Sequence, residues 1–85
     1  MYNGVNYFNG ENMKIPLKVS VGLKLKERRN QMGLTQREVA KKLAVAQPIY
    51  QRFEKGVFEC SYEQLRDLCV LFDLSADYLL GLKEY

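Results

Sequence analysis

The sequence contains no histidine, the side chain that most often serves as a general base or a zinc ligand. Only two cysteines are present, Cys60 and Cys69, and their spacing matches neither a redox pair nor the usual zinc-ligand pattern. Cys69 falls on the apolar stripe of an expected helix, where a cysteine packs as a small apolar side chain. There is also no glycine-rich phosphate loop. We therefore expect no catalytic residue, no metal site and no cofactor.

Long apolar runs are absent too. No segment approaches the roughly 18 consecutive apolar residues of a membrane-spanning helix, and the N-terminus lacks the layout of a secretory signal. These absences predict a cytoplasmic protein without membrane contact. A chain of 85 residues suits one small domain and leaves no room for a large enclosed active site or a ligand-sensing domain.

The charged side chains are distributed unevenly along the chain, although the net charge is only +3. Residues 20–56 contain nine basic and three acidic side chains, which gives +6. Residues 57–85 contain two basic and six acidic side chains, which gives −4. A basic segment of this kind attracts polyanions such as nucleic acids. A solvated surface without function would give the same counts, so charge alone leaves both interpretations open.

Residues 1–19 are expected to form an N-terminal arm or a short β-hairpin. Val5 to Phe8 precede Asn9-Gly10, a dipeptide that suits a tight hairpin turn, and apolar residues then alternate from Met13 to Val21. Pro16 would confine such a strand to the edge of a sheet. The alternative is a loosely ordered, extended arm.

Residues 20–82 predict one all-α domain of five short helices, with residues 83–85 as a C-terminal tail. Helical spacing begins at Val21 and continues to Gly33, which suits a left-handed C-terminal cap. Thr35 and the glutamate three positions later form a capping-box pattern, which starts the second helix.

The last three helices are indicated by similar local signals. Pro48 is tolerated in the first turn of a helix, so the third helix starts at Ala46 or Gln47. Ser61 with a glutamine three positions later starts the fourth helix, and Ser75 starts the fifth. Links of only a few residues between these helices favour a compact bundle.

The second and third helices are too short to be stable alone, so packing must hold them. Tyr50, Phe53 and Glu54 share one side of the third helix and are expected to face the core, together with Val39 and Leu43 of the second. The rest of the third helix is polar.

This pattern resembles the helix-turn-helix domain of the phage repressor and Cro family, also called the XRE family. The resemblance covers roughly residues 21–82. The matching residues are Gly33-Leu34-Thr35-Gln36, Val39-Ala40, Leu43, Val45, Gln47, Tyr50, Phe53-Glu54, Gly56 and Leu74-Ser75-Ala76-Asp77-Tyr78-Leu79-Leu80-Gly81. It implies a compact, five-helix fold like that of the lambda repressor.

The resemblance also implies that the third helix enters the major groove of DNA, with Gln47, Pro48 and Arg52 at base-reading positions. A glutamine amide can pair with adenine and a guanidinium with guanine, whereas a proline side chain offers no donor. A second group is implied to contact phosphates or to brace the third helix, namely Thr35, Gln36, Arg37, Gln51 and Lys55. Arg29 and Glu54 match a buried ion pair that ties the first helix to the third.

Two positions depart from the family pattern. Ala44 stands where the family often has glycine in the turn, and Ala46 stands where serine or threonine often caps the third helix. The loss of such a cap typically costs about 1 kcal/mol.

The expected function is therefore that of a DNA-binding transcriptional regulator, a repressor that binds a two-fold operator as a homodimer. The dimer would form through the fifth helix and the acidic C-terminal part, or through edge-to-edge pairing of the N-terminal hairpin. The alternative is a protein-interaction module, such as the antitoxin of a toxin pair, whose N-terminal segment docks on a protein partner.

Overall fold

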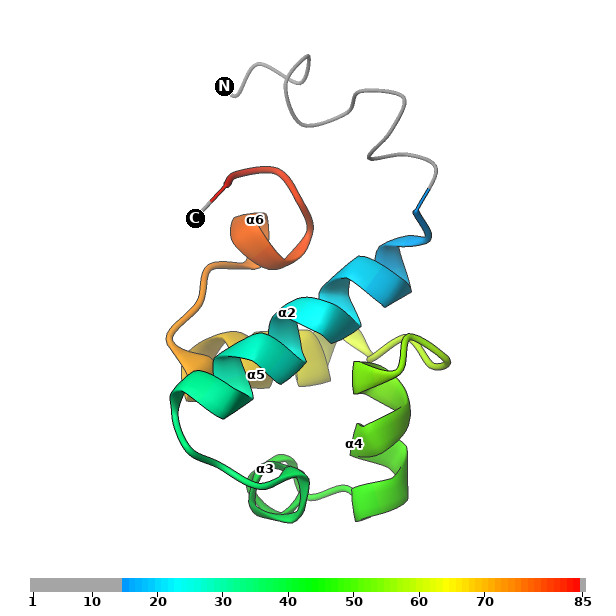
Figure 1. Ribbon diagram of the computed structural model, residues 1–85, viewed down its shortest axis with the longest axis vertical. Helices are drawn as coiled ribbons and strands as arrows, with labels where there is room; N and C mark the ends of the chain where they lie inside the picture. The colour runs from blue at the N-terminus through cyan, green and yellow to red at the C-terminus, as the bar shows by residue number, and fades with distance from the viewer. Residues whose placement is uncertain (1–14, 85) are drawn as a thin grey trace.

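The computed structural model describes residues 15–84, and within this range the chain forms five helices and no strand. In chain order they are α2 (Leu17–Gln31), α3 (Gln36–Leu43), α4 (Gln47–Glu54), α5 (Tyr62–Phe72) and α6 (Ala76–Leu79). Figure 1 shows α2 crossing the molecule, with α3 and α4 below it and α6 above it. No described helix has the length and apolar character needed to cross a membrane. The expected all-α fold is confirmed.

The strand expected up to Val21 is wrong for the residues that the structure describes. Helix α2 begins at Leu17, directly after Pro16, whose backbone is still extended at φ −54° and ψ 135°. Leu17, Val21 and Leu25 recur at the four-residue interval of a helix, so these apolar residues fit both an alternating and a helical pattern. The rest of the expected hairpin, residues 1–14, lies outside the described residues.

Capping side chains set the starts of the short helices. Thr35 and Ser61 each form a complete capping box with the residue three positions later. Ser75 accepts a hydrogen bond from the backbone N–H of Tyr78 and so caps α6. Gly33, just after α2, has a φ of 68°, which a glycine adopts without steric cost. The helix starts at these three capping residues are therefore confirmed.

The core is built from fully buried side chains that all five helices contribute. Its largest members are Leu25, Val39, Tyr50, Leu68, Phe72 and Leu79. Burial of one such side chain stabilises a fold by about 1.5–3 kcal/mol, so packing compensates for the low intrinsic stability of these short helices. Cys69 is partly buried against the same core, as expected from its place on the apolar stripe of α5.

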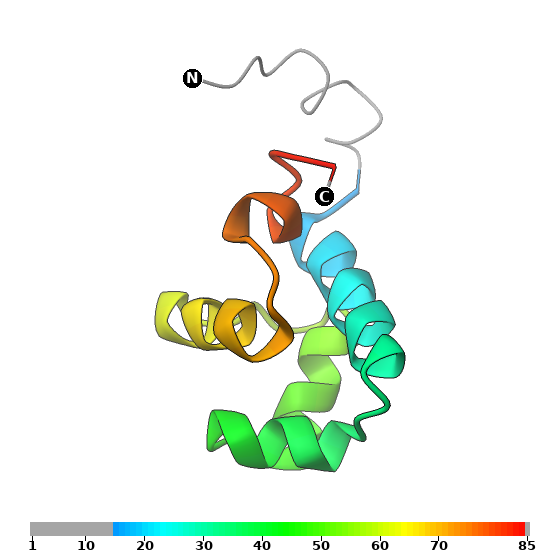
Figure 2. The same ribbon diagram turned by 90° about the vertical axis from the view of Figure 1, so that its left-hand side faces the viewer.

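Helix α2 lies unusually close to the C-terminal end of α4. A Cβ atom at Gly22 would lie 2.4 Å from the carbonyl oxygen of Phe53 and 2.6 Å from that of Glu54. A Cβ atom at Gly56 would lie 2.8 Å from the Cα atom of Val19. Figure 2 shows α2 and α4 side by side from a second direction. Because glycine has no side chain, the two backbones can come into contact at these positions. This contact holds the C-terminal end of α4 against α2.

Candidate nucleic-acid interface

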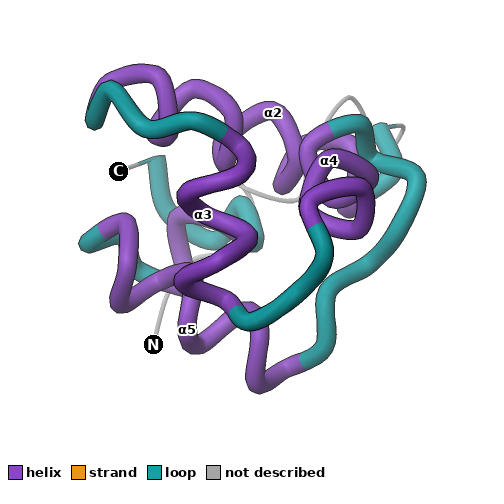
Figure 3. Tube along the Cα trace, turned by 90° about the horizontal axis from the view of Figure 1, so that it is seen from below, coloured by secondary structure: helices purple, strands orange, loops and turns teal. Residues whose placement is uncertain are grey.

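A short turn joins α3 to α4 and places the two helices on one face of the molecule. Ala44 ends α3 in the left-handed conformation, at φ 58° and ψ 40°. The backbone N–H groups of Ala44 and Val45 donate to Lys41 and Ala40, at 3.1 and 3.0 Å, and so satisfy the last carbonyls of α3. Seen from below, α3 and α4 lie beside each other on this face (Figure 3).

The first turn of α4 has no side-chain cap. Ala46 is the N-cap residue and makes no side-chain hydrogen bond, while Pro48 occupies the first turn. The carbonyl of Ala46 accepts from the backbone N–H of Ile49 at 2.9 Å and of Tyr50 at 3.2 Å. Proline presets the backbone angle of the first turn and removes one N–H that would otherwise lack a partner. The N-terminal end of α4 therefore begins without a polar side chain at its cap.

The inner side of α4 holds an ion pair with α2. Arg29 Nε donates to Glu54 Oε2 at 2.6 Å, and Arg29 Nη2 donates to Glu54 Oε1 at 3.0 Å. The Glu54 side chain is only 2% exposed and that of Arg29 12%. Arg29 Nη1 also donates to the carbonyl oxygen of Leu34 at 3.0 Å, so one guanidinium joins α2, α4 and the link between α2 and α3. Both pair members are thus hydrogen-bonded as well as charge-matched.

A chain of amide hydrogen bonds leads from this ion pair to the start of α4. Gln36 Nε2 donates to Glu54 Oε1 at 3.0 Å, and Gln47 Nε2 donates to Gln36 Oε1 at 2.9 Å. An ionised carboxylate only accepts hydrogen bonds, so Gln36 must turn its Nε2 toward Glu54 and its oxygen toward Gln47. Gln47 keeps its own oxygen and one N–H for another partner, the set that can pair with adenine.

Hydrogen bonding keeps this carboxylate ionised. Burial alone would raise the pKa of Glu54, but the hydrogen bonds from Arg29 and Gln36 outweigh it and hold the pKa below its ordinary value. The hydrogen bond from Glu54 in turn raises the pKa of the Arg29 guanidinium. Both shifts favour the charged pair.

Tyr50 is the main apolar support beneath the pair. Its side chain is fully buried, and its ring meets that of Phe53 edge to face, with 6.3 Å between the ring centroids. Its hydroxyl makes no hydrogen bond to any residue within the described range. Burial and the nearby Glu54 carboxylate raise the pKa of Tyr50. The phenol therefore stays neutral beside the ion pair.

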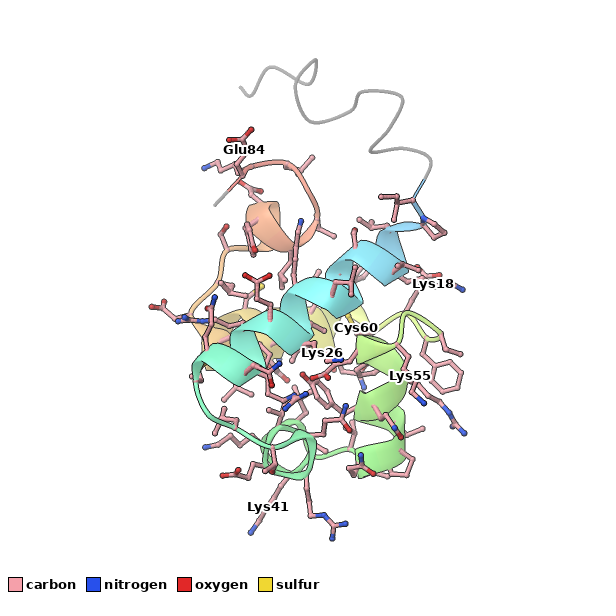
Figure 4. All side chains as sticks on the ribbon, in the orientation of Figure 1. Lys18, Lys26, Lys41, Lys55, Cys60 and Glu84 are labelled. Carbon is pink, nitrogen blue, oxygen red and sulfur yellow. The ribbon has the colours of Figure 1, made fainter. Side chains whose placement is uncertain are left out.

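The residues expected to meet DNA differ in their exposure. On α4, Pro48, Arg52 and Lys55 are exposed, whereas Gln47 and Gln51 are partly buried. Figure 4 shows Lys55 at the C-terminal end of α4, the end that packs against α2. Of the exposed residues in this group, Arg52 and Lys55 are thus basic and Pro48 is apolar.

Helix α3 contributes basic side chains to the same face. Arg37 is exposed there, while Thr35 uses its hydroxyl oxygen to accept from the N–H of Glu38 at 3.1 Å. Lys41 and Lys42, in the last turn of α3, are exposed as well. Lys41 points away from the body of the molecule at one end, and Glu84 lies at the opposite end (Figure 4). One lysine of the basic segment and one acidic residue of the C-terminal part thus lie at opposite ends of the molecule.

Two contacts of the site were not expected from the sequence. The hydrogen bond from Gln36 to Glu54 joins residues 18 positions apart. The guanidinium of Arg52 lies over the ring of Phe58, in the link after α4, with 5.1 Å between Cζ and the ring centroid. Neither contact follows from a helical period, because each depends on how separate segments pack.

Comparison with known proteins identifies the fold family. A family model described as helix-turn-helix matches residues 25–79. An uncharacterised HTH-type transcriptional regulator of Bacillus subtilis, YqaE, is 41% identical over 56 residues, covering 66% of this chain and 48% of the relative. The HTH-type transcriptional regulator ImmR of the same organism is 36% identical over 66 residues, covering 78% of this chain and 52% of the relative. The chain therefore spans about half the length of these curated relatives.

Solved structures show the same arrangement of helices. The clp gene regulator ClgR of Corynebacterium glutamicum superposes with a TM-score of 0.73 at 29% identity, covering 78% of this chain and 70% of that chain. A second structure of the same regulator gives a TM-score of 0.70 and covers 86% of that chain. Together with the family model, which matches more than half of the sequence, these likenesses show that the chain belongs to the XRE-type helix-turn-helix family.

Proposed function

We propose that this protein is a sequence-specific DNA-binding transcriptional regulator, a repressor that inserts α4 into the major groove. The observation that carries the proposal is the hydrogen-bonded amide of Gln47 at the start of α4. Gln36 holds this amide, and Glu54 holds Gln36. The remaining oxygen and N–H of Gln47 suit a bidentate pair with adenine. Two relatives of this chain are named as transcriptional regulators, which supports the same function.

The roles of the other residues follow from their positions around α4. Arg52 is exposed on the same helix, and its guanidinium suits guanine N7 and O6. Pro48 occupies the leading turn and offers only van der Waals contact. The side chains assigned to the phosphates on either side of the groove, or to bracing α4, are Thr35, Gln36, Arg37, Gln51 and Lys55. The positive charges of Arg37 and Lys55 would give affinity without sequence preference.

A homodimer on a two-fold operator is part of this proposal. A single module buries only roughly 600–1,000 Å² on DNA, which limits its affinity. Proteins of this kind usually increase the contact area by pairing two modules on half-sites about 34 Å apart. The contact between protomers would involve α6 and the acidic C-terminal part, or residues 1–14. Cross-linking the full chain and a chain that begins at Ile15 separates these routes. Equal dimer yields would exclude the N-terminal route.

A second candidate function is protein interaction, as in an antitoxin that docks on a toxin. The observation that favours it is an apolar groove of about 270 Å³ beside the start of α2, where residues 1–14 join the domain. Leu17, Phe58 and Tyr62 line this groove and are exposed. Recovery of a bound protein partner that depends on residues 1–14, without any preferred DNA sequence, would favour this candidate.

The central test is selection of a preferred duplex from random DNA, followed by binding measurements across a salt series. Gln47→Ala and Arg52→Ala should each lose about 1–3 kcal/mol on the selected site and much less on random duplex. Arg66→Ala is the matched control, because it removes an exposed arginine from α5, away from α4. If no sequence is enriched, or if both α4 variants bind like the wild type, α4 does not read bases.

A further inference from the structure

The link between α4 and α5 folds back over the last turn of α4. The backbone N–H groups of Val57 and Phe58 both donate to the carbonyl oxygen of Arg52, at 3.0 and 3.3 Å. Gly56 makes this reversal possible with a φ of 72°, a value that other residues rarely adopt. The result is that Phe58, six positions after Arg52, lies next to the Arg52 side chain.

The guanidinium of Arg52 lies over the ring of Phe58. Arg52 Cζ lies 5.1 Å from the centroid of the Phe58 ring, within the range of a cation–π contact. Within the described part of the chain, the Arg52 side chain forms no salt bridge and no hydrogen bond. The Phe58 ring is therefore the side-chain contact that restricts it. A guanidinium that stacks through its flat face keeps its N–H donors free in the plane of the group. These are the donors that a guanine or a phosphate would need.

We propose that Phe58 is a positioning residue for DNA recognition, whose ring holds the Arg52 guanidinium in the orientation used on DNA. The proposal rests on the proposed function, because it assigns Phe58 a role only through Arg52. Ordering a long, exposed arginine on binding has an entropic cost, and a ring that already restricts it lowers that cost. Phe58 is 40% exposed, so its ring lies at the surface beside the exposed Arg52.

Phe58 also lines the apolar groove between α2, α4 and α5, so a purely structural role is the competing explanation. The two roles differ in their dependence on Arg52. A structural role would change the stability of the domain whatever residue stands at position 52. A positioning role would change DNA binding only while a planar guanidinium is there to be held.

The experiment measures binding to the selected duplex by fluorescence anisotropy for four variants of the full chain. Phe58→Leu removes the ring, Phe58→Tyr retains it, Arg52→Lys keeps the charge without the flat face, and a double variant combines Phe58→Leu with Arg52→Lys. Val70→Ala is the control for loss of an exposed apolar side chain, since Val70 is 78% exposed on α5. Thermal unfolding of each variant identifies the temperature at which all of them are folded, and binding is measured there.

Phe58→Leu should weaken binding about two- to five-fold, the strength of an exposed cation–π contact, and Phe58→Tyr should rescue it. The double variant should bind no more weakly than Arg52→Lys alone, because the ring then has no guanidinium to hold. Wild-type binding by Phe58→Leu, or losses that multiply in the double variant, would overturn the proposal. If Arg52→Lys binds as well as the wild type, Arg52 is no specific contact and the positioning role fails. Failure to enrich any duplex would instead overturn the proposed function itself.

Discussion

Replacement of Arg29 by methionine should destabilise the protein strongly, because it leaves the Glu54 carboxylate buried without its counter-ion. Glu54 is 2% exposed at its side chain and accepts two hydrogen bonds from Arg29. A hydrogen bond to a charged group contributes about 1.5–3 kcal/mol, so two of them predict a loss of about 3–6 kcal/mol. This agrees with the about 3–5 kcal/mol expected when one partner of a buried pair is removed.

Such a loss is large relative to the stability of the whole domain. A chain of 85 residues has a free energy of unfolding of about 4–13 kcal/mol. Glu54→Gln should cost less than Arg29→Met, because the Arg29 side chain is 12% exposed and can still reach water. The double variant should cost less than the two single changes together, since it leaves no buried charge without a partner.

Urea unfolding followed by far-ultraviolet circular dichroism measures these differences, with Lys26→Met as the control for loss of an exposed cation on the same helix. The control should stay within about 0.5 kcal/mol of the wild type. A cost below about 1 kcal/mol for Arg29→Met, which is the range of an exposed ion pair, would refute the reasoning. Additive costs in the double variant would refute it as well.

Three further predictions concern the backbone and the pH dependence. Gly22→Ala should lose about 3 kcal/mol in urea unfolding, the upper end of the cost of overpacking, because its Cβ would meet carbonyl oxygens of α4 at 2.4 and 2.6 Å. Gly33→Ala should lose only about 1–2 kcal/mol from left-handed strain, because nothing lies within 4 Å of a Cβ atom at this position. Equal losses for Gly22→Ala and Gly33→Ala would contradict the close approach of α2 to α4. Ala44→Gly should gain about 0.5–1 kcal/mol by relieving strain at φ 58°, and a loss would count against that strain. Because the pKa of Glu54 is held below its ordinary value of 4.5, its contribution is complete above pH 4.5 and is lost as the pH falls through the lowered pKa. Glu54→Gln should therefore flatten the fall in stability measured below pH 4.5, and an unchanged acid profile would assign that fall to other groups.

Most helix boundaries could be predicted because their signals are local. Thr35 and Ser61 each need only the residue three positions later to complete a capping box, and Gly33 needs only its own backbone freedom. The start of α2 was predicted wrongly, at Val21 instead of Leu17, since both residues fit an alternating as well as a helical period. Packing decides between these periods, and packing depends on residues far away in the sequence.

The candidate site divides in the same way. The polar positions of α4, including Gln47 and Arg52, follow from helical spacing and from the family resemblance. The hydrogen bond from Gln36 to Glu54 and the contact of Arg52 with the Phe58 ring join separate segments, so no periodic pattern indicates them. The latter contact depends on one backbone angle, the positive φ of Gly56.

The buried charge of Glu54 has a consequence beyond stability, because it sets the direction of every hydrogen bond that leads to Gln47. A carboxylate cannot donate, so Gln36 presents its Nε2 to Glu54 and its oxygen to Gln47. A neutral glutamine at position 54 could accept or donate, and the amide chain could then run in either direction. Under the proposed function, the base preference of Gln47 therefore depends on the charge of a buried residue that never touches DNA.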